Sequence, residues 1–100
     1  MSGLSFLVLE CSDLAASRHF YEALLSVRFV VESHGAGPEH LSTVLEGGTV
    51  LELYPGSGKA RSVRLGLSIR DVPAARERLG AGAGPLRDPD GRRVILVEPV

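Results

Sequence analysis

The sequence predicts an α+β fold made of two units of the βαβββ type, of which the second is shortened. Short segments alternate apolar and polar residues with the period of a strand, and two longer segments repeat apolar residues at helical spacing. In addition, LVLECSDLAASR at residues 7–18 aligns with LGLSIRDVPAAR at residues 65–76, which places Asp13 over Asp71. This internal repeat predicts one unit at about residues 4–54 and a second at about residues 63–98, within one domain at residues 1–100.

The first unit begins with a predicted strand at residues 4–11, whose two faces are both largely apolar. Ser12 and Asp13 can accept hydrogen bonds from the free N–H groups of a following helix, which we expect at Leu14–Leu25. Turn-forming residues then separate three further predicted strands, at residues 27–32, 41–46 and 49–54.

The second unit begins with an alternating strand at residues 63–69, after a flexible connector PGSGKA at residues 55–60. Asp71 is expected to cap a helix that has Pro73 in its first turn. Only GAGAGPLR separates this helix from Asp88, so at most one short strand fits there. The turn DPDG at residues 88–91 then leads into a last strand at residues 92–98.

Composition excludes several classes of protein. A chain of 100 residues and 10.6 kDa supports one hydrophobic core. Eleven Lys and Arg against twelve Asp and Glu leave no basic surface of the kind that binds nucleic acid. The apolar runs are too short to span a membrane and no basic leader is visible, so we expect a cytoplasmic protein. The single cysteine, Cys11, excludes an internal disulfide.

Two motifs resemble those of the vicinal oxygen chelate superfamily, which contains glyoxalases, bleomycin-resistance proteins and extradiol dioxygenases. They are the helix start DLAASRHFY at residues 13–21 and the turn DPDG that precedes the last hydrophobic strand. The resemblance covers nearly the whole chain, and it implies a glyoxalase-like domain whose two units form a half-barrel of mixed sheet around a cavity. It also implies a homodimer, but no particular reaction, because a fold does not determine function.

In superfamily members that do metal chemistry, the resemblance implies ligands on the first and last strands of each unit. Carried over by the two motifs, these positions are Phe6, Glu52, Arg64 and Ile95. Phenylalanine and isoleucine have no donor atom, and a cationic arginine repels a metal ion. Because only Glu52 could bind a metal, we expect that the family's metal site is lost and that no cofactor is held there.

We therefore expect the cavity to bind a small organic ligand between apolar walls and a few polar groups. The predicted ligand-binding residues are Phe6, Val8, Glu52, Tyr54, Arg64, Ser68 and Ile95, with Val97 as a further apolar wall. Arg93 could add positive charge at the mouth of the cavity, although a solvated arginine is commoner. Glu10 shares the predicted cavity face, but charged residues at strand ends usually face water.

An ion pair between Glu52 and Arg64 is the expected replacement for the missing metal. Strand alternation turns both side chains toward the cavity, where an arginine can satisfy a half-buried carboxylate bidentately. This hypothesis predicts that Arg64→Ala is more destabilising than a change at an exposed arginine. Alternatively, Arg64 holds an anionic group of a ligand while Glu52 accepts a hydroxyl or acts as a base.

Two other function classes stay open. One is an enzyme of the same superfamily, a lyase, isomerase or dioxygenase, which works without a metal or through ligands at neighbouring strand positions. The other is a structural dimer whose cavity is filled by its own side chains. Dimerisation itself is expected because a second unit that lacks strands leaves a sheet edge and apolar surface uncovered.

The remaining candidates favour structural roles. His34 and His40 flank a turn-rich segment and are expected on a surface loop, although two histidines near one turn could reach a common ion. Cys11 precedes a helix, where a thiol pKa can be lowered, but it also fits a small buried hydrophobe. The segment GSGK at residues 56–59 lacks the flanking residues that a phosphate loop requires.

Overall fold

The computed structural model describes residues 1–57 and 63–99. The elements follow one another in the order β-α-β-β-β and then β-α-β-β. The first group is β1 (Phe6–Cys11), α1 (Leu14–Leu25), β2 (Val30–Glu32), β3 (His40–Val44) and β4 (Val50–Pro55). The second group is β5 (Arg64–Ser68), α2 (Val72–Leu79), β6 (Leu86–Arg87) and β7 (Arg93–Val97). This is the α+β architecture expected from the sequence, and part of the connector at residues 55–60 lies outside the described residues.

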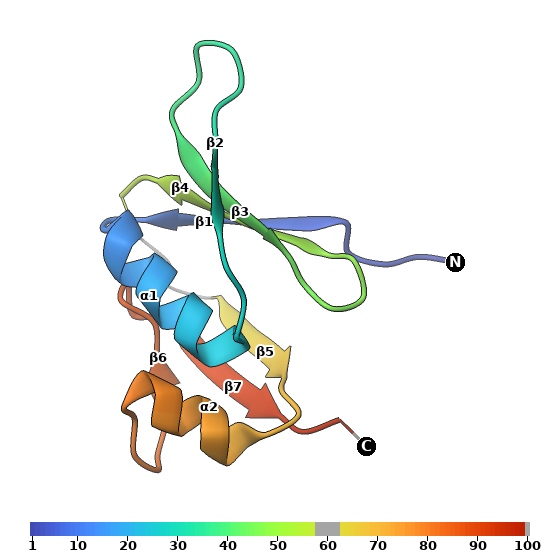
Figure 1. Ribbon diagram of the computed structural model, residues 1–100, viewed down its shortest axis with the longest axis vertical. Helices are drawn as coiled ribbons and strands as arrows, with labels where there is room; N and C mark the ends of the chain where they lie inside the picture. The colour runs from blue at the N-terminus through green and yellow to red at the C-terminus, as the bar shows by residue number, and fades with distance from the viewer. Residues whose placement is uncertain (58–62, 100) are drawn as a thin grey trace.

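The strands form two separate sheets (Figure 1). The first, which we call sheet A, has the order β1-β4-β3-β2, and the second, sheet B, has the order β5-β7-β6. In both sheets the strand that precedes the helix pairs in parallel with the last strand of its group, and the other pairs are antiparallel. The turn between β3 and β4 uses Gly47 and Gly48 at φ values of 95° and 100°, where other residues are strained.

Both helices begin where the aspartate pattern predicts. The carboxylate of Asp13 accepts a hydrogen bond of 3.0 Å from the backbone N–H of Ala16, and Asp71 does the same for Ala74 at 3.0 Å. These caps satisfy backbone donors that the first turn of a helix leaves free. Neither helix within the described ranges is long and apolar enough to cross a membrane.

A continuous hydrophobic core joins both helices to one face of each sheet. Along the strands its buried members alternate with residues that are partly or fully exposed. The core includes Leu9, Phe20, Tyr21, Leu24, Leu51, Leu53, Leu65, Ala75 and Val94. Because successive strand residues point to opposite faces, each sheet has a second face that is turned away from this core. We call these second faces the open face of sheet A and the open face of sheet B.

A buried polar network ties the turn before β7 to the first group of elements. The carboxylate of Asp88 accepts a hydrogen bond of 2.6 Å from the Tyr21 hydroxyl and one of 2.9 Å from the Arg92 guanidinium. Arg92 also donates to the backbone carbonyl of Glu10 on β1. Burial alone would raise the pKa of Asp88, but the hydrogen bonds from Tyr21 and Arg92 outweigh it, so that the pKa is lowered. Burial and the hydrogen bond to Asp88 raise the pKa of Tyr21.

Most strand boundaries differ from the predicted ones by one or two residues, and that of β2 differs by three. Strand β2 begins at Val30 rather than at residue 27, because Phe29 is buried in the core and donates its backbone N–H to Glu22 at 2.9 Å. The segment after α2 forms a strand of only two residues, Leu86–Arg87, in agreement with the expected shortening of the second group.

Candidate functional site

The open face of sheet A combines acidic and apolar side chains in two adjacent rows. The register pairs Glu52 of β4 with Val8 of β1 and with Ser42 of β3, so these side chains lie side by side. In the next row, Tyr54 of β4 pairs with Glu10 of β1, and His40 of β3 pairs with Glu32 of β2. The face therefore brings together residues that are up to 46 positions apart in the sequence, from Val8 to Tyr54.

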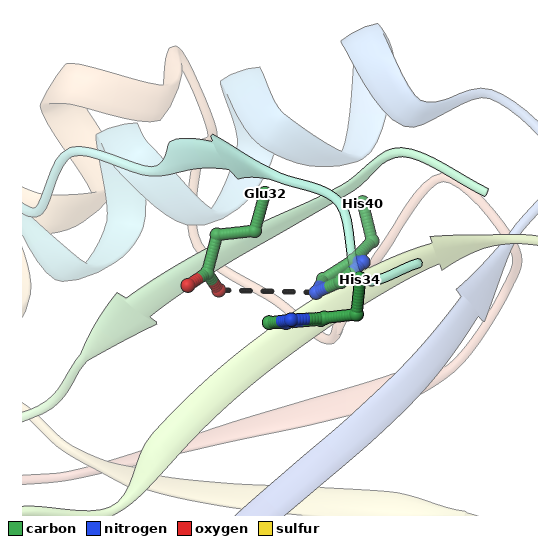
Figure 2. A group of neighbouring side chains, drawn as sticks. All are labelled: Glu32, His34 and His40. Carbon is green, nitrogen blue, oxygen red and sulfur yellow. Dashed lines mark ion pairs between the residues drawn. The ribbon is translucent and has the colours of Figure 1, made fainter. Parts of the chain in front are cut away.

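His40 is the centre of the polar part of this face. Its side chain is 1% exposed, and its ring stacks on that of Tyr54 with a centroid distance of 4.1 Å and an interplanar angle of 8°. The Nε2 atom lies 3.3 Å from Oε2 of Glu52 and 3.8 Å from Oε1 of Glu32. The ring of His34 lies 5.1 Å from the His40 ring, centroid to centroid (Figure 2). Two carboxylates, two imidazoles and a phenol thus meet at one place.

Both ring nitrogens of His40 face polar atoms. The Nδ1 atom lies 3.4 Å from the backbone carbonyl oxygen of Pro38. The Nε2 atom faces the carboxylates of Glu32 and Glu52 and also lies 3.4 Å from the hydroxyl oxygen of Tyr54. Partial burial and the charges of Glu52 and Glu32 raise the pKa of Tyr54.

Large apolar side chains surround this polar cluster and are exposed. Phe6 is 60% exposed, Val8 41%, Val30 59% and Val44 64%. Isolated exposed apolar residues are ordinary, but four on one sheet face give that face a large apolar area. In a single protomer this surface is an open platform rather than an enclosed cavity.

The open face of sheet B is basic and apolar. The register pairs Arg93 of β7 with Arg64 of β5 on one side and with Arg87 of β6 on the other, which sets three exposed arginines in a row. Ile95 and Val97 continue the same face and are 43% and 51% exposed. Like charges placed directly opposite each other across strands are destabilising, so this row favours an anionic partner.

The seven predicted ligand-binding residues are thus distributed over both sheets. Phe6, Val8, Glu52 and Tyr54 lie on the open face of sheet A, and Arg64, Ser68 and Ile95 lie on the open face of sheet B.

The expected ion pair between Glu52 and Arg64 does not form within one protomer. Glu52 pairs with His40 instead, and the exposed Arg64 makes no ion pair with any residue in the ranges 1–57 and 63–99. The reason is geometric. Each open face points away from the shared core, so Glu52 and Arg64 do not face each other. The arginine that does satisfy a buried carboxylate is Arg92, which is 4% exposed.

A hollow on the surface lies elsewhere, beside α2. Its volume is about 480 Å³, and its lining includes Val72, Arg76 and Gly82. It is shallow, and the guanidinium of Arg76 already donates hydrogen bonds of 2.6 and 2.9 Å to the carbonyl oxygens of Gly82 and Gly84. With its polar group occupied, this hollow is a weaker candidate than the open face of sheet A.

Comparison with known families decides the classification. Residues 6–100 match the family model described as a glyoxalase-like domain. The chain belongs to this family. The glyoxalase-like assignment agrees with the resemblance drawn from the helix start and the DPDG turn. No curated protein sequence gives a significant match to the chain.

Solved structures of the glyoxalase and bleomycin-resistance group share this fold. TnmS3, an antibiotic binding protein from a Streptomyces species, is 23% identical with a TM-score of 0.68, and the alignment covers 100% of this chain and 98% of that one. A glyoxalase/bleomycin resistance protein from Catenulispora acidiphila is 19% identical with a TM-score of 0.69, covering 98% and 100%. The oxidase ChaP-H2 is 13% identical with a TM-score of 0.71, covering 99% and 94%. At these identities the likeness establishes the fold alone.

The residues that the resemblance places at the superfamily's metal positions have side chains that do not fit a metal ion. Of Phe6, Glu52, Arg64 and Ile95, only Glu52 has a donor group that binds cations. Phe6 and Arg64 also lie on different sheets, on faces turned away from the common core. A metal bound through these four positions would have a single protein ligand.

His40 is the residue of the candidate site that sequence reasoning misplaced. It was expected on a surface loop, but it is the first residue of β3 and is buried. Glu32 pairs with His40 across the β2–β3 hairpin and so shares its face, but this register is a property of the structure that the sequence does not reveal. Cys11, in contrast, is 2% exposed and burial raises the pKa of its thiol, which fits a buried hydrophobe.

Proposed function

We propose that this glyoxalase-like protein binds a small organic ligand on the open face of sheet A, and that the open face of sheet B of a second copy completes the site. The observation that carries the proposal is the composition of the first face. Exposed Phe6 and Val8 adjoin the half-buried Glu52 and the stacked pair of Tyr54 and His40. Apolar surface with a few convergent polar groups is typical of ligand sites.

Charge complementarity supports the second copy as the cover. The open face of sheet A carries three carboxylates, from Glu10, Glu32 and Glu52, and the open face of sheet B carries the row of three arginines. Both faces also expose apolar side chains that a monomer would leave in water. A two-fold dimer that lays sheet A on the partner's sheet B would form two equivalent sites.

This dimer would reunite the predicted ligand-binding residues. Phe6, Val8, Glu52 and Tyr54 would come from one protomer, and Arg64, Ser68 and Ile95 from the partner. The ion pair of Glu52 with Arg64 would then form between chains rather than within one. Opposite charges across an interface suppress wrong partners and fix the register of association.

The proposal is in line with one relative of the same fold, since TnmS3 is described as an antibiotic binding protein. A thermal-shift screen with a fragment library tests it in this chain, because a ligand that binds the folded state raises the melting temperature. We expect hits that raise the melting temperature and compete with one another for the face. A screen without any such hit would contradict ligand binding and favour a purely structural dimer.

A further inference from the structure

We propose that Glu32, His34 and His40, at the end of the β2–β3 hairpin, bind one divalent transition-metal ion. The site is distinct from the four superfamily metal positions, and it goes beyond the proposed ligand binding, which does not require it. Each of the three residues offers one ligand atom, and these atoms all lie within 4.8 Å of one another. Figure 2 shows the three side chains converging from the hairpin toward one point.

The distance between His40 and Glu32 is close to that between two ligand atoms of a tetrahedral ion. Zinc bonds to imidazole nitrogen and carboxylate oxygen are about 2.0–2.2 Å long, so that two ligand atoms of a tetrahedral ion lie about 3.3–3.6 Å apart. The separation between His40 Nε2 and Glu32 Oε1 is 3.8 Å. A shift of a few tenths of an ångström, within rotamer freedom of the partly exposed Glu32, brings these atoms to that distance.

The surroundings provide the charge and the support that a metal ligand needs. A metal-bound histidine commonly directs its other ring nitrogen to a carbonyl oxygen, and Nδ1 of His40 faces that of Pro38 at 3.4 Å. Glu52 faces the same Nε2 atom at 3.3 Å and adds a second carboxylate. The carboxylates of Glu32 and Glu52 together balance the charge of a divalent cation at this place.

The exposure of the three side chains predicts an open site. The side chain of His40 is buried, whereas that of Glu32 is 38% exposed and His34 is exposed. Three protein ligands with solvent on one side leave a coordination position for water or another small donor. Mixed imidazole and carboxylate ligands favour Zn²⁺, Co²⁺ or Ni²⁺ over Ca²⁺ or Mg²⁺, which take oxygen ligands.

Zinc titration against a chromophoric chelator tests the site in the full chain. We expect saturable binding of one Zn²⁺ per chain, and a visible absorption band of tetrahedral Co²⁺ when cobalt replaces zinc. The key variants are His34→Ala and Glu32→Gln, because both side chains are at least partly exposed and their loss leaves the core intact. Removing a residue that only contacts a metal ligand already lowers metal affinity about 10–100-fold. Each variant removes a proposed ligand itself and should therefore weaken zinc binding by at least about 100-fold.

The matched control is His19→Ala, which removes an exposed histidine on α1 outside the cluster and should bind zinc like the wild type. Zinc affinity that is unchanged in His34→Ala, or equally reduced in His19→Ala, would overturn the site, as would the absence of saturable binding in the wild type. Fragment binding measured in His34→Ala with a chelator present separates the two proposals. Retained fragment binding with lost zinc binding supports both, whereas zinc binding without any fragment hit overturns only the proposed function.

Discussion

Val8 and Glu52 are register partners in the parallel pair of β1 and β4. An exposed aliphatic side chain and a half-buried carboxylate therefore lie next to each other on the open face of sheet A. Neither is part of the hydrophobic core. Their adjacency is the reason to place ligand binding on this face, because it offers apolar area beside a group that accepts hydrogen bonds.

Shortening Val8 should weaken ligand binding without unfolding the protein. Val8→Ala removes apolar contact worth roughly 1–1.5 kcal/mol, which is about tenfold in Kd for a ligand on this face. Val31→Ala is the matched control, because Val31 is 57% exposed on the same sheet but pairs with Leu41, on the other face. Titration of both variants with a fragment hit measures the difference. Equal losses in the two variants would argue against the open face as the binding surface.

Reversing charge in the arginine row should disrupt the dimer. Light scattering of the wild type at micromolar concentration should give twice the 10.6 kDa of the chain. Arg64→Glu would place a carboxylate against the acidic face of the partner and should shift the mass toward that of one chain, because like charges across an interface repel. Arg28→Glu makes the same change at an exposed position outside the strands and should leave the mass unchanged. A wild type that is monomeric at this concentration would refute the dimer.

Removing the buried arginine should cost far more stability than removing a surface one. Arg92→Ala leaves Asp88 buried without its cationic partner, which costs about 3–5 kcal/mol of unfolding free energy by analogy with broken buried pairs. Arg70→Ala breaks an ion pair with Glu46 that is mostly exposed, and such pairs contribute about 0–1 kcal/mol. Urea denaturation of both variants measures the contrast. Similar losses would show that the network around Asp88 does not stabilise the fold.

Asp88 should make the protein sensitive to acid. Its pKa is lower in the folded protein than in the unfolded chain, where it is about 3.9, so it contributes stability above that pH. This contribution is lost as pH falls below about 4 and through the folded-state pKa. Urea denaturation at steps from pH 6 to pH 2 should show this loss in the wild type. Asp88→Asn should be less stable at pH 6 and should depend less steeply on pH below 4, and an equally steep loss in both proteins would contradict this role.

Local patterns were sufficient to predict most of the fold. The two aspartates aligned by the repeat, Asp13 and Asp71, both cap helices, and α1 occupies the predicted residues. Periodicity and capping act between neighbours in the sequence, so they can be seen in the sequence alone. The start of β2 was misjudged because burial of Phe29 is a tertiary effect.

The site was harder to predict because it depends on how the sheets are placed. Alternation puts Glu52 and Tyr54 on one face of their strand and Arg64 and Ser68 on one face of theirs, but we expected both faces to line one cavity, and they belong to different sheets. Whether two faces meet depends on helix packing, which the alternation of residues does not encode. The burial of His40 likewise follows from the hairpin register, which the sequence between Glu32 and His40 does not reveal.

The most direct test is an NMR map of fragment binding on uniformly ¹⁵N-labelled protein. A hit from the thermal-shift screen should shift backbone amide signals of β1, β3 and β4, with the largest changes near Val8, Glu52 and Tyr54. In the dimer, signals near Arg64 should move at the same ligand concentration. Shifts confined to the hollow around Arg76 and Gly82 beside α2, with the strands of sheet A unaffected, would contradict the proposed binding face.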